Sequence, residues 1–226
     1  MKEFLSYILK PEDAVWPGEP SIEITQCTCI GEDGNFANTF KSILPNHCGT
    51  HYDAPFHFNA NGPRITELPV EYFWFENVVT LDIPKAPEEG VRQEDLERKE
   101  EEIKKADLLL LKTGFYKYRS EEPKTYSARG PYMDPGACRY LVDNFPDLRC
   151  IGFDFLSIGS PCNDLSVAAH QALLGCYKDK FITGIEDMNL EPLYRIDKKI
   201  RRVIVAPLRM AKVDSSQVTV IADFED

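Results

Sequence analysis

The chain has 226 residues, of which 43% are hydrophobic and 28% are charged, and its formal net charge at pH 7 is −11. This composition excludes a disordered or collagen-like chain and is sufficient for one hydrophobic core, so we expect a single domain over residues 1–226. The excess of acidic groups speaks against a nucleic-acid partner, and no apolar run approaches the roughly 20 residues that a membrane-spanning helix needs.

The first predicted element is a β-hairpin. Residues Ile22–Ile30 alternate apolar and polar side chains, which is typical of a half-buried strand. The turn sequence GEDGN at 31–35 separates them from a second extended segment at 36–44. Val78–Ile83 is a further predicted strand, closed by Pro84.

Helices and buried strands are predicted to alternate through the middle of the chain. Residues 91–106 are rich in Glu and Lys with several acid–base pairs four apart, so we expect one solvated helix there. Leu108–Lys112 and Ile151–Phe155 are typical of buried strands. Between them, Asp134 and Pro135 favour the start of a helix that continues to about Asn144.

The last part of the chain predicts one short helix and three strands. Asp164 or Ser166 would cap the helix, and Gly175 would end it. Strands are expected at 180–185, 202–205 and 217–222. Strands separated by helices predict an α/β fold, with a mixed, twisted β-sheet flanked by helices.

The N-terminal residues and the cysteines both favour a cytoplasmic protein. The first 18 residues contain Lys2, Glu3 and Lys10 and have no continuous apolar stretch of the kind found in signal peptides. The seven cysteines form no CxxC motif, so free thiols are expected.

Three of the four histidines lie in one short segment, HCGTHYDAPFH at 47–57. Gly49, Thr50 and Pro55 disfavour a helix, so we expect a tight loop or irregular strand. In an extended backbone His51, Asp53 and His57 point to the same side and can face one cavity. Imidazole and carboxylate ligands suit Zn²⁺, Mn²⁺, Fe²⁺ or Co²⁺ better than Ca²⁺ or Mg²⁺. The segment therefore predicts a metal site, and the near absence of sulfur indicates a catalytic one.

The same segment resembles the HxGTHxDxPxH signature of the cyclase family of metal-dependent hydrolases, which includes bacterial kynurenine formamidases and isatin hydrolases. Residues 14–20 (AVWPGEP), residues 152–161 (GFDFLSIGSP), and the stretch from His170 to Glu186 resemble further segments of that family in the expected order. The resemblance implies a kynurenine formamidase-like fold and a homodimer.

The resemblance also implies a metal centre with two divalent ions per chain, Zn²⁺ in first place and Mn²⁺ as the alternative. The metal ligands that it implies are His47, His51, Asp53, His170 and Glu186. Of these, Asp53 and Glu186 would contact both ions. Because the interval from His170 to Glu186 is longer than in the formamidases, Asp187 and Glu191 are alternatives for the last ligand.

The expected activity is hydrolysis of a small amide, formamide or lactam, with an aromatic or cyclic amide as substrate. By resemblance, His57 is the proton-transfer residue for a metal-activated water, and Trp16 is a wall against which the substrate stacks. One alternative is a catalytically silent member that binds a metal or ligand, and another is a cyclase or dehydratase acting on a polyketide-like substrate. A third makes Cys48 a thiolate nucleophile paired with His51 or His57.

Overall fold

The computed structural model describes residues 1–225, and a mixed β-sheet forms its centre. Nine strands within these residues build the sheet in the order β5-β12-β13-β4-β11-β10-β8-β6, with β1 beside β13. The parallel half contains β6 (Val78–Asp82), β8 (Leu108–Lys112), β10 (Cys150–Phe153) and β11 (Thr183–Glu186). The antiparallel half contains β1 (Lys2–Phe4), β4 (His51–Asp53), β5 (Trp74–Phe75), β12 (Ile200–Pro207) and β13 (Ser215–Phe224). The predicted mixed α/β fold is confirmed.

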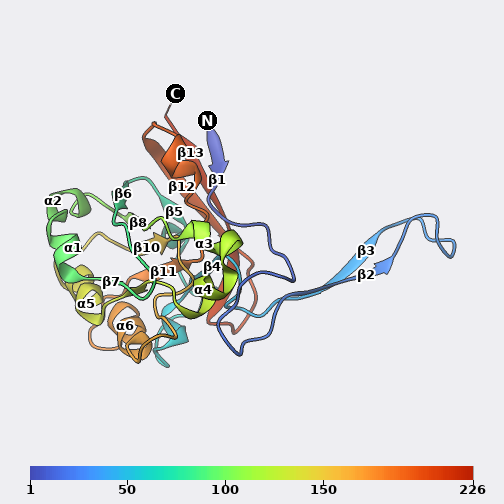
Figure 1. Cartoon of the computed structure of the whole chain (residues 1–226), viewed down its shortest axis with the longest axis horizontal. Coiled ribbons are helices and arrows are strands. Elements are labelled where there is room, and N and C mark those ends of the chain that lie inside the picture. Colours follow the sequence, from blue (N-terminus) through green and yellow to red (C-terminus); the bar gives the residue numbers. More distant parts are fainter. Residues whose placement is uncertain (226) are drawn as a thin grey trace.

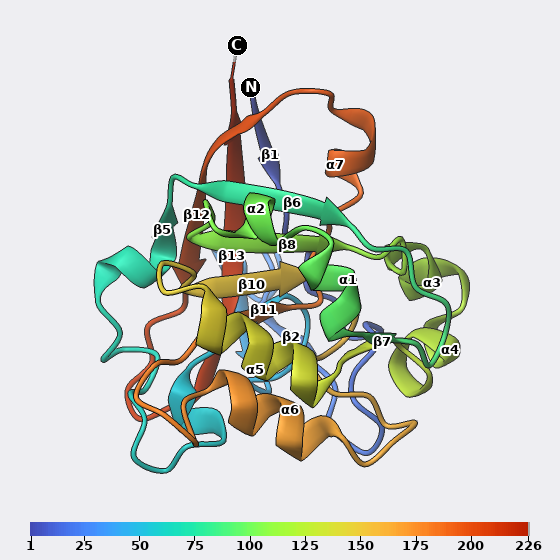
Figure 2. The same ribbon diagram turned by 90° about the vertical axis from the view of Figure 1, so that its left-hand side faces the viewer.

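Helices cover one face of the parallel half (Figure 2). The helices on this face are α1 (Gln93–Glu97), α2 (Glu100–Ile103), α5 (Pro135–Asn144) and α6 (Ser166–Leu173). The remaining short elements are α3 (Tyr116–Glu121), α4 (Pro123–Ala128), α7 (Pro192–Arg195), the 3-10 turns Pro55–His57 and Val70–Phe73, and the paired strands β7 (Gly90–Val91) and β9 (Tyr132–Met133). No helix within residues 1–225 combines the length and the apolar character that crossing a bilayer requires.

Strand β8 shows how the sheet divides the core. Its four leucines are fully buried. Because side chains alternate along a strand, Leu109 and Leu111 pack toward the helices, while Leu108 and Leu110 pack toward β12 and β13. A strand buried on both faces has a continuous apolar sequence. For this reason the predicted bounds of the strand, Leu108–Lys112, agree with the observed ones.

Two predictions about helices were wrong in detail. The single helix expected over 91–106 is two short helices, α1 and α2, because Lys99 has φ −122° and ψ 16°. Leu96 and Ile103 are buried, but all residues between them are charged, and a surface helix is stabilised mainly by packing of an apolar face. Helix α6 is capped by neither Asp164 nor Ser166: its N-cap is Leu165, which makes no side-chain cap.

The predicted hairpin is present as an arm that projects from the body (Figure 1). Its strands, β2 (Glu23–Thr28) and β3 (Thr39–Ile43), pair only with each other among the described strands. The expectation of half-buried strands was wrong, because nearly every residue of both strands is exposed. The apolar–polar alternation therefore does not mark a face packed on this chain's own core.

Candidate metal centre

Strand β4 carries two of the predicted ligands in the middle of the sheet. It lies between β11 and β13, with His51 opposite Glu186 and Asp53 opposite Gly184. Cross-strand neighbours point to the same face, and Nε2 of His51 lies 3.1 Å from Oε2 of Glu186. The same nitrogen lies 3.6 Å from Oδ1 of Asp53. The period-2 expectation is confirmed for His51 and Asp53, in a regular strand rather than an irregular one. It was wrong for His57, because the chain leaves the extended conformation and forms a 3-10 turn at Pro55–His57.

His47 reaches the same cluster from the loop before β4. Its Nδ1 lies 3.2 Å from Oδ1 of Asp53. The chain between them turns at Gly49, which has φ +63°, and a Cβ at this position would collide with the side chain of Leu9. Glycine therefore fits here for two reasons, its left-handed backbone and the close approach of Leu9.

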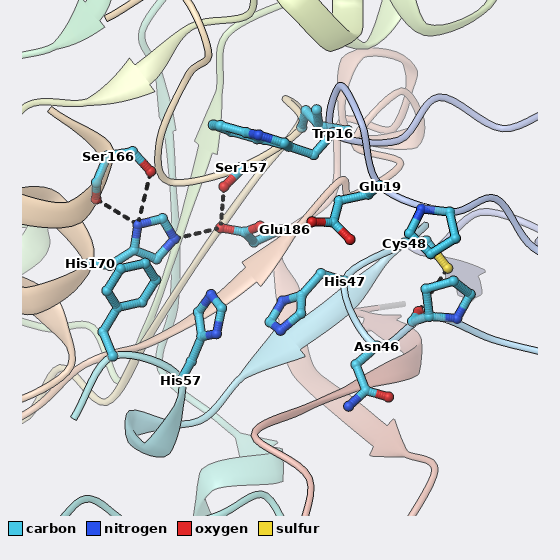
Figure 3. Close-up of a pocket in the computed structure, with 14 residues that line it drawn as sticks. Trp16, Glu19, Asn46, His47, Cys48, His57, Ser157, Ser166, His170 and Glu186 are labelled. Carbon is cyan, nitrogen blue, oxygen red and sulfur yellow. Dashed lines mark hydrogen bonds and ion pairs between the residues drawn. The ribbon is translucent and has the colours of Figure 1, made fainter. Parts of the chain in front are cut away.

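The later half of the chain completes the cluster through His170 of α6 and Glu186 of β11 (Figure 3). Nε2 of His170 lies 3.7 Å from Oε1 of Glu186. That oxygen accepts hydrogen bonds from the backbone N–H of Ile158 at 2.6 Å and from Oγ of Ser157 at 3.1 Å. The loop after β10 thus fixes the orientation of the Glu186 carboxylate. The resemblance pointed to this loop, but not to these two contacts.

Backbone carbonyls orient two of the imidazoles toward the cluster. Nδ1 of His51 lies 2.8 Å from the carbonyl oxygen of Gly49, and Nδ1 of His170 lies 2.7 Å from that of Ser166. A carbonyl oxygen can only accept, so both Nδ1 atoms carry the proton. In the neutral ring each Nε2 is then free to bind a metal ion, which is the arrangement that metal-ligating histidines usually show.

The cluster fits a divalent cation because the carboxylate of Asp53 and Nε2 of His51, at its centre, are buried and make no hydrogen bond within the described residues. Two sets of donor atoms lie within 4.8 Å of one another: His47, Asp53 and His57 in one, and His51, Asp53 and Glu186 in the other. Buried ionised groups are costly unless paired or bound to metal, and Asp53 belongs to both sets.

The charges of the cluster favour a cation in the same way. Burial raises the pKa of Glu186, but the imidazoles of His170 and His51 outweigh burial and hold this pKa well below its usual value. Burial lowers the pKa of His47, but Asp53 and Asp214 outweigh burial and raise it to about 11. Two buried carboxylates that stay ionised create a negative field, and this field attracts protons onto His47 or a metal ion into the cluster.

His57 lies at the edge of the cluster, on the 3-10 turn Pro55–His57. Its Nε2 is 3.9 Å from Oδ2 of Asp53, and its Nδ1 is 2.9 Å from Oδ2 of Asp214. Asp214 also lies 3.0 Å from Nε2 of His47. Sequence reasoning missed Asp214 because it precedes β13, far from the histidine segment in the sequence, and no motif marks it.

A pocket of about 320 Å³ opens onto the cluster. His47, His57, His170 and Glu186 line one side of it, and the ring of Trp16 lies across from them (Figure 3). Phe58 also lines the pocket and stacks on His170, with ring centroids 4.4 Å apart. The pocket therefore combines apolar walls with a few convergent polar groups, as small-molecule sites usually do.

Three other residues singled out from the sequence do not join the donor cluster, although Cys48 lines the same pocket. The Cys48 thiol is buried, donates a hydrogen bond to the carbonyl oxygen of Pro45 at 2.9 Å, and has its pKa raised to about 11 by burial. Asp187 turns away from the cluster and pairs with Arg119, while Glu191 pairs with Arg195. The structure thus brings Glu186 to the histidines, and not Asp187 or Glu191.

Comparison with known proteins agrees with the resemblance seen in the sequence. The Cyclase family model, described as "Putative cyclase", matches residues 4–160. An uncharacterized protein of Haemophilus influenzae is 43% identical over 142 residues, which are 63% of this chain and 96% of that protein. The kynurenine formamidase of Bacillus cytotoxicus is 26% identical over 217 residues, which are 96% of this chain and 94% of that enzyme.

The solved structures show the same fold. An isatin hydrolase bound to the product analogue thioisatinate aligns with a TM-score of 0.82 at 20% sequence identity, over 98% of this chain and 91% of that chain. Isatin hydrolase A from Labrenzia aggregata aligns with a TM-score of 0.80 at 23% identity, over 98% of this chain and 93% of that chain. Because the family model matches more than half of the residues, the chain belongs to the Cyclase family.

Proposed function

We propose that the chain is a metal-dependent hydrolase that cleaves the C–N bond of a small amide, formamide or lactam. The observation that carries this proposal is the convergence of histidines and carboxylates around Asp53, whose buried oxygens make no hydrogen bond within residues 1–225. The names of its relatives support the reaction class, since they include kynurenine formamidase and isatin hydrolase.

The proposed metal ligands are those expected from the sequence: His47, His51, Asp53, His170 and Glu186. We propose two divalent ions per chain, Zn²⁺ or Mn²⁺, with Asp53 and Glu186 contacting both. When bound, such ions lower the pKa of water and polarise a carbonyl oxygen. The membership of Asp53 in both donor sets supports its assignment as a shared ligand.

His57 is the proposed acid and base of the reaction. Asp214 accepts a hydrogen bond from Nδ1–H of His57, so Nε2 carries no proton in the neutral ring and faces the cluster. This nitrogen takes the proton from the attacking water and returns it to the leaving nitrogen. A positioned acid–base group typically contributes about 10² to 10⁴ in rate.

The pocket supports a small aromatic or cyclic substrate. Trp16 offers an aromatic face opposite the donor cluster, and Phe58 and Leu156 extend the apolar lining. A flat ring that stacks on Trp16 brings its amide carbonyl toward the cluster, which restricts the orientations in which the substrate binds.

Metal content measured by mass spectrometry, together with a hydrolysis screen, tests the proposal. The screen uses formanilides, isatins and lactones as three distinct carbonyl classes. We expect bound Zn²⁺ or Mn²⁺ and metal-dependent cleavage of at least one nitrogen-containing class, lost with a chelator and restored by the metal. A metal-loaded protein that cleaves only lactones contradicts the C–N assignment. A protein that binds no metal at any tested concentration contradicts the whole proposal.

A further inference from the structure

The mouth of the pocket carries an aromatic ring and a carboxylate in one tight turn. The backbone N–H of Glu19 donates to the carbonyl oxygen of Trp16 at 2.9 Å, and the turn passes through Gly18 at φ +93°. Both side chains line the pocket, with the Glu19 carboxylate directed toward its interior (Figure 3). The turn therefore places a negative charge beside the proposed stacking surface.

This carboxylate is not committed to another protein group. Within residues 1–225 the Glu19 side chain makes no hydrogen bond or ion pair. The described residues that line the pocket include no lysine or arginine. Apart from the histidines and the two glutamates, its polar side chains are those of Asn46, Cys48, Ser157 and Ser166. An anionic substituent placed beside Glu19 would be repelled by its carboxylate, and no described lysine or arginine lines the pocket to pair with that substituent.

We propose that the substrate is an aromatic amide with a protonated amine at the end remote from the scissile bond. This inference rests on the proposed function. Glu19 pairs with this ammonium group, and the face of Trp16 adds a cation–π contact. The remote position matters because a cation close to His47 and His170 would be repelled by the metal ions proposed there. Glu19 would therefore select for positive charge at the mouth, while the donor cluster acts at the inner end.

The size of the effect follows from the exposure of Glu19. Exposed ion pairs and cation–π contacts are each modest, so we expect the cationic substrate to be preferred about 3- to 10-fold over a neutral one of the same shape. An anionic substrate of that shape should be disfavoured by a similar factor. The preference should weaken as salt is raised, because the mouth is open to solvent.

A matched series of formanilides tests this with the metal-loaded protein. The para substituents are aminomethyl, methyl and carboxymethyl, which change the charge and keep the size similar. We expect kcat/KM to fall in that order, and Glu19→Gln to bring the three values together while metal content stays unchanged. The control is Glu23→Gln, which removes the same charge from the exposed arm outside the pocket and should leave the order intact.

A binding measurement separates this inference from the proposed function. Trp16 and Trp74 are the two tryptophans, and Trp74 does not line the pocket, so Trp74→Phe leaves Trp16 as the only indole reporter. The corresponding anilines should quench its fluorescence with the same charge order, whether or not any formanilide is cleaved. Cleavage or binding with no charge preference, or with one that Glu19→Gln does not change, overturns the inference. Loss of metal in Glu19→Gln also overturns it, since Glu19 would then be a ligand.

Discussion

Oδ2 of Asp214 lies 2.9 Å from Nδ1 of His57, although 157 residues separate the two in the sequence. β4 and β13 pair side by side, and this pairing brings the residue before β13 next to the turn after β4. Sheet topology, and not local sequence, therefore supplies the partner of the proposed acid–base histidine.

Replacing Asp214 with Asn should lower kcat with a smaller effect on KM. The amide can donate as well as accept, so it no longer selects the ring form in which Nδ1 carries the proton. We expect a loss of about 10²-fold, at the lower end of what a positioned acid–base group contributes. Steady-state kinetics with the best substrate of the screen measures this. Asp82→Asn, at an exposed side chain of β6, is the control, and equal losses in both variants would contradict the assigned role.

His57→Ala and Asp53→Ala should separate proton transfer from metal binding. His57 belongs to one donor set only and is not among the proposed ligands, so its removal should abolish turnover while metal content is retained. Asp53 belongs to both donor sets, so its removal should abolish both. Metal analysis of each purified variant gives the answer. If His57→Ala also emptied the site, His57 would have to be reassigned as a ligand.

Cys48→Ser should retain nearly full activity. The thiol is buried, hydrogen-bonded to Pro45, and has a raised pKa, so little thiolate exists near neutral pH. Activity assays with and without an alkylating reagent complete the test. Abolished turnover in Cys48→Ser, with the metal still bound, would favour the thiol mechanism over the one proposed here.

Local sequence patterns predicted the elements whose position depends mainly on neighbouring residues, such as a buried strand and the start of a helix. The apolar run of β8 and the Asp134–Pro135 start of α5 are present as predicted, and Asp134 accepts a hydrogen bond from the N–H of Gly136. The histidine segment was also informative, because its spacing alone indicated a shared cavity for His51 and Asp53.

Tertiary contacts decided what the sequence could not. Residue spacing left Glu186, Asp187 and Glu191 open, and the register of β11 against β4 distinguishes them by setting Glu186 opposite His51. The exposed strands of the arm show the same apolar–polar alternation as half-buried strands. Alternation indicates that the two faces of a strand differ in polarity, but it does not indicate whether either face is covered. Asp214 carries no local signal at all.

Removing the cation of the buried ion pair next to Glu186 should strongly destabilise the fold. Asp187 adopts φ +50°, and its carboxylate receives the Arg119 guanidinium at 2.9 Å and the Tyr126 hydroxyl at 2.6 Å. Arg119→Met leaves this carboxylate buried without its cation, which should lower the free energy of unfolding by about 3 to 5 kcal/mol. Urea denaturation measures the change. Arg129→Met breaks the exposed pair with Glu88 and should cost under about 1 kcal/mol; similar losses in the two variants would contradict the prediction.

The arm offers a test of the predicted homodimer. A two-stranded hairpin with both faces in water is only marginally stable, yet this one also exposes Phe40 and, at 96%, Phe36. We expect the arm to pack against a second copy, so Phe36→Ser with Phe40→Ser should shift the chain from dimer to monomer in light scattering after size exclusion. Phe4→Ser, at an exposed position on β1, is the control. A monomeric unmodified chain would contradict the homodimer, and a dimer that survives the double change would exclude these two side chains as its main contacts.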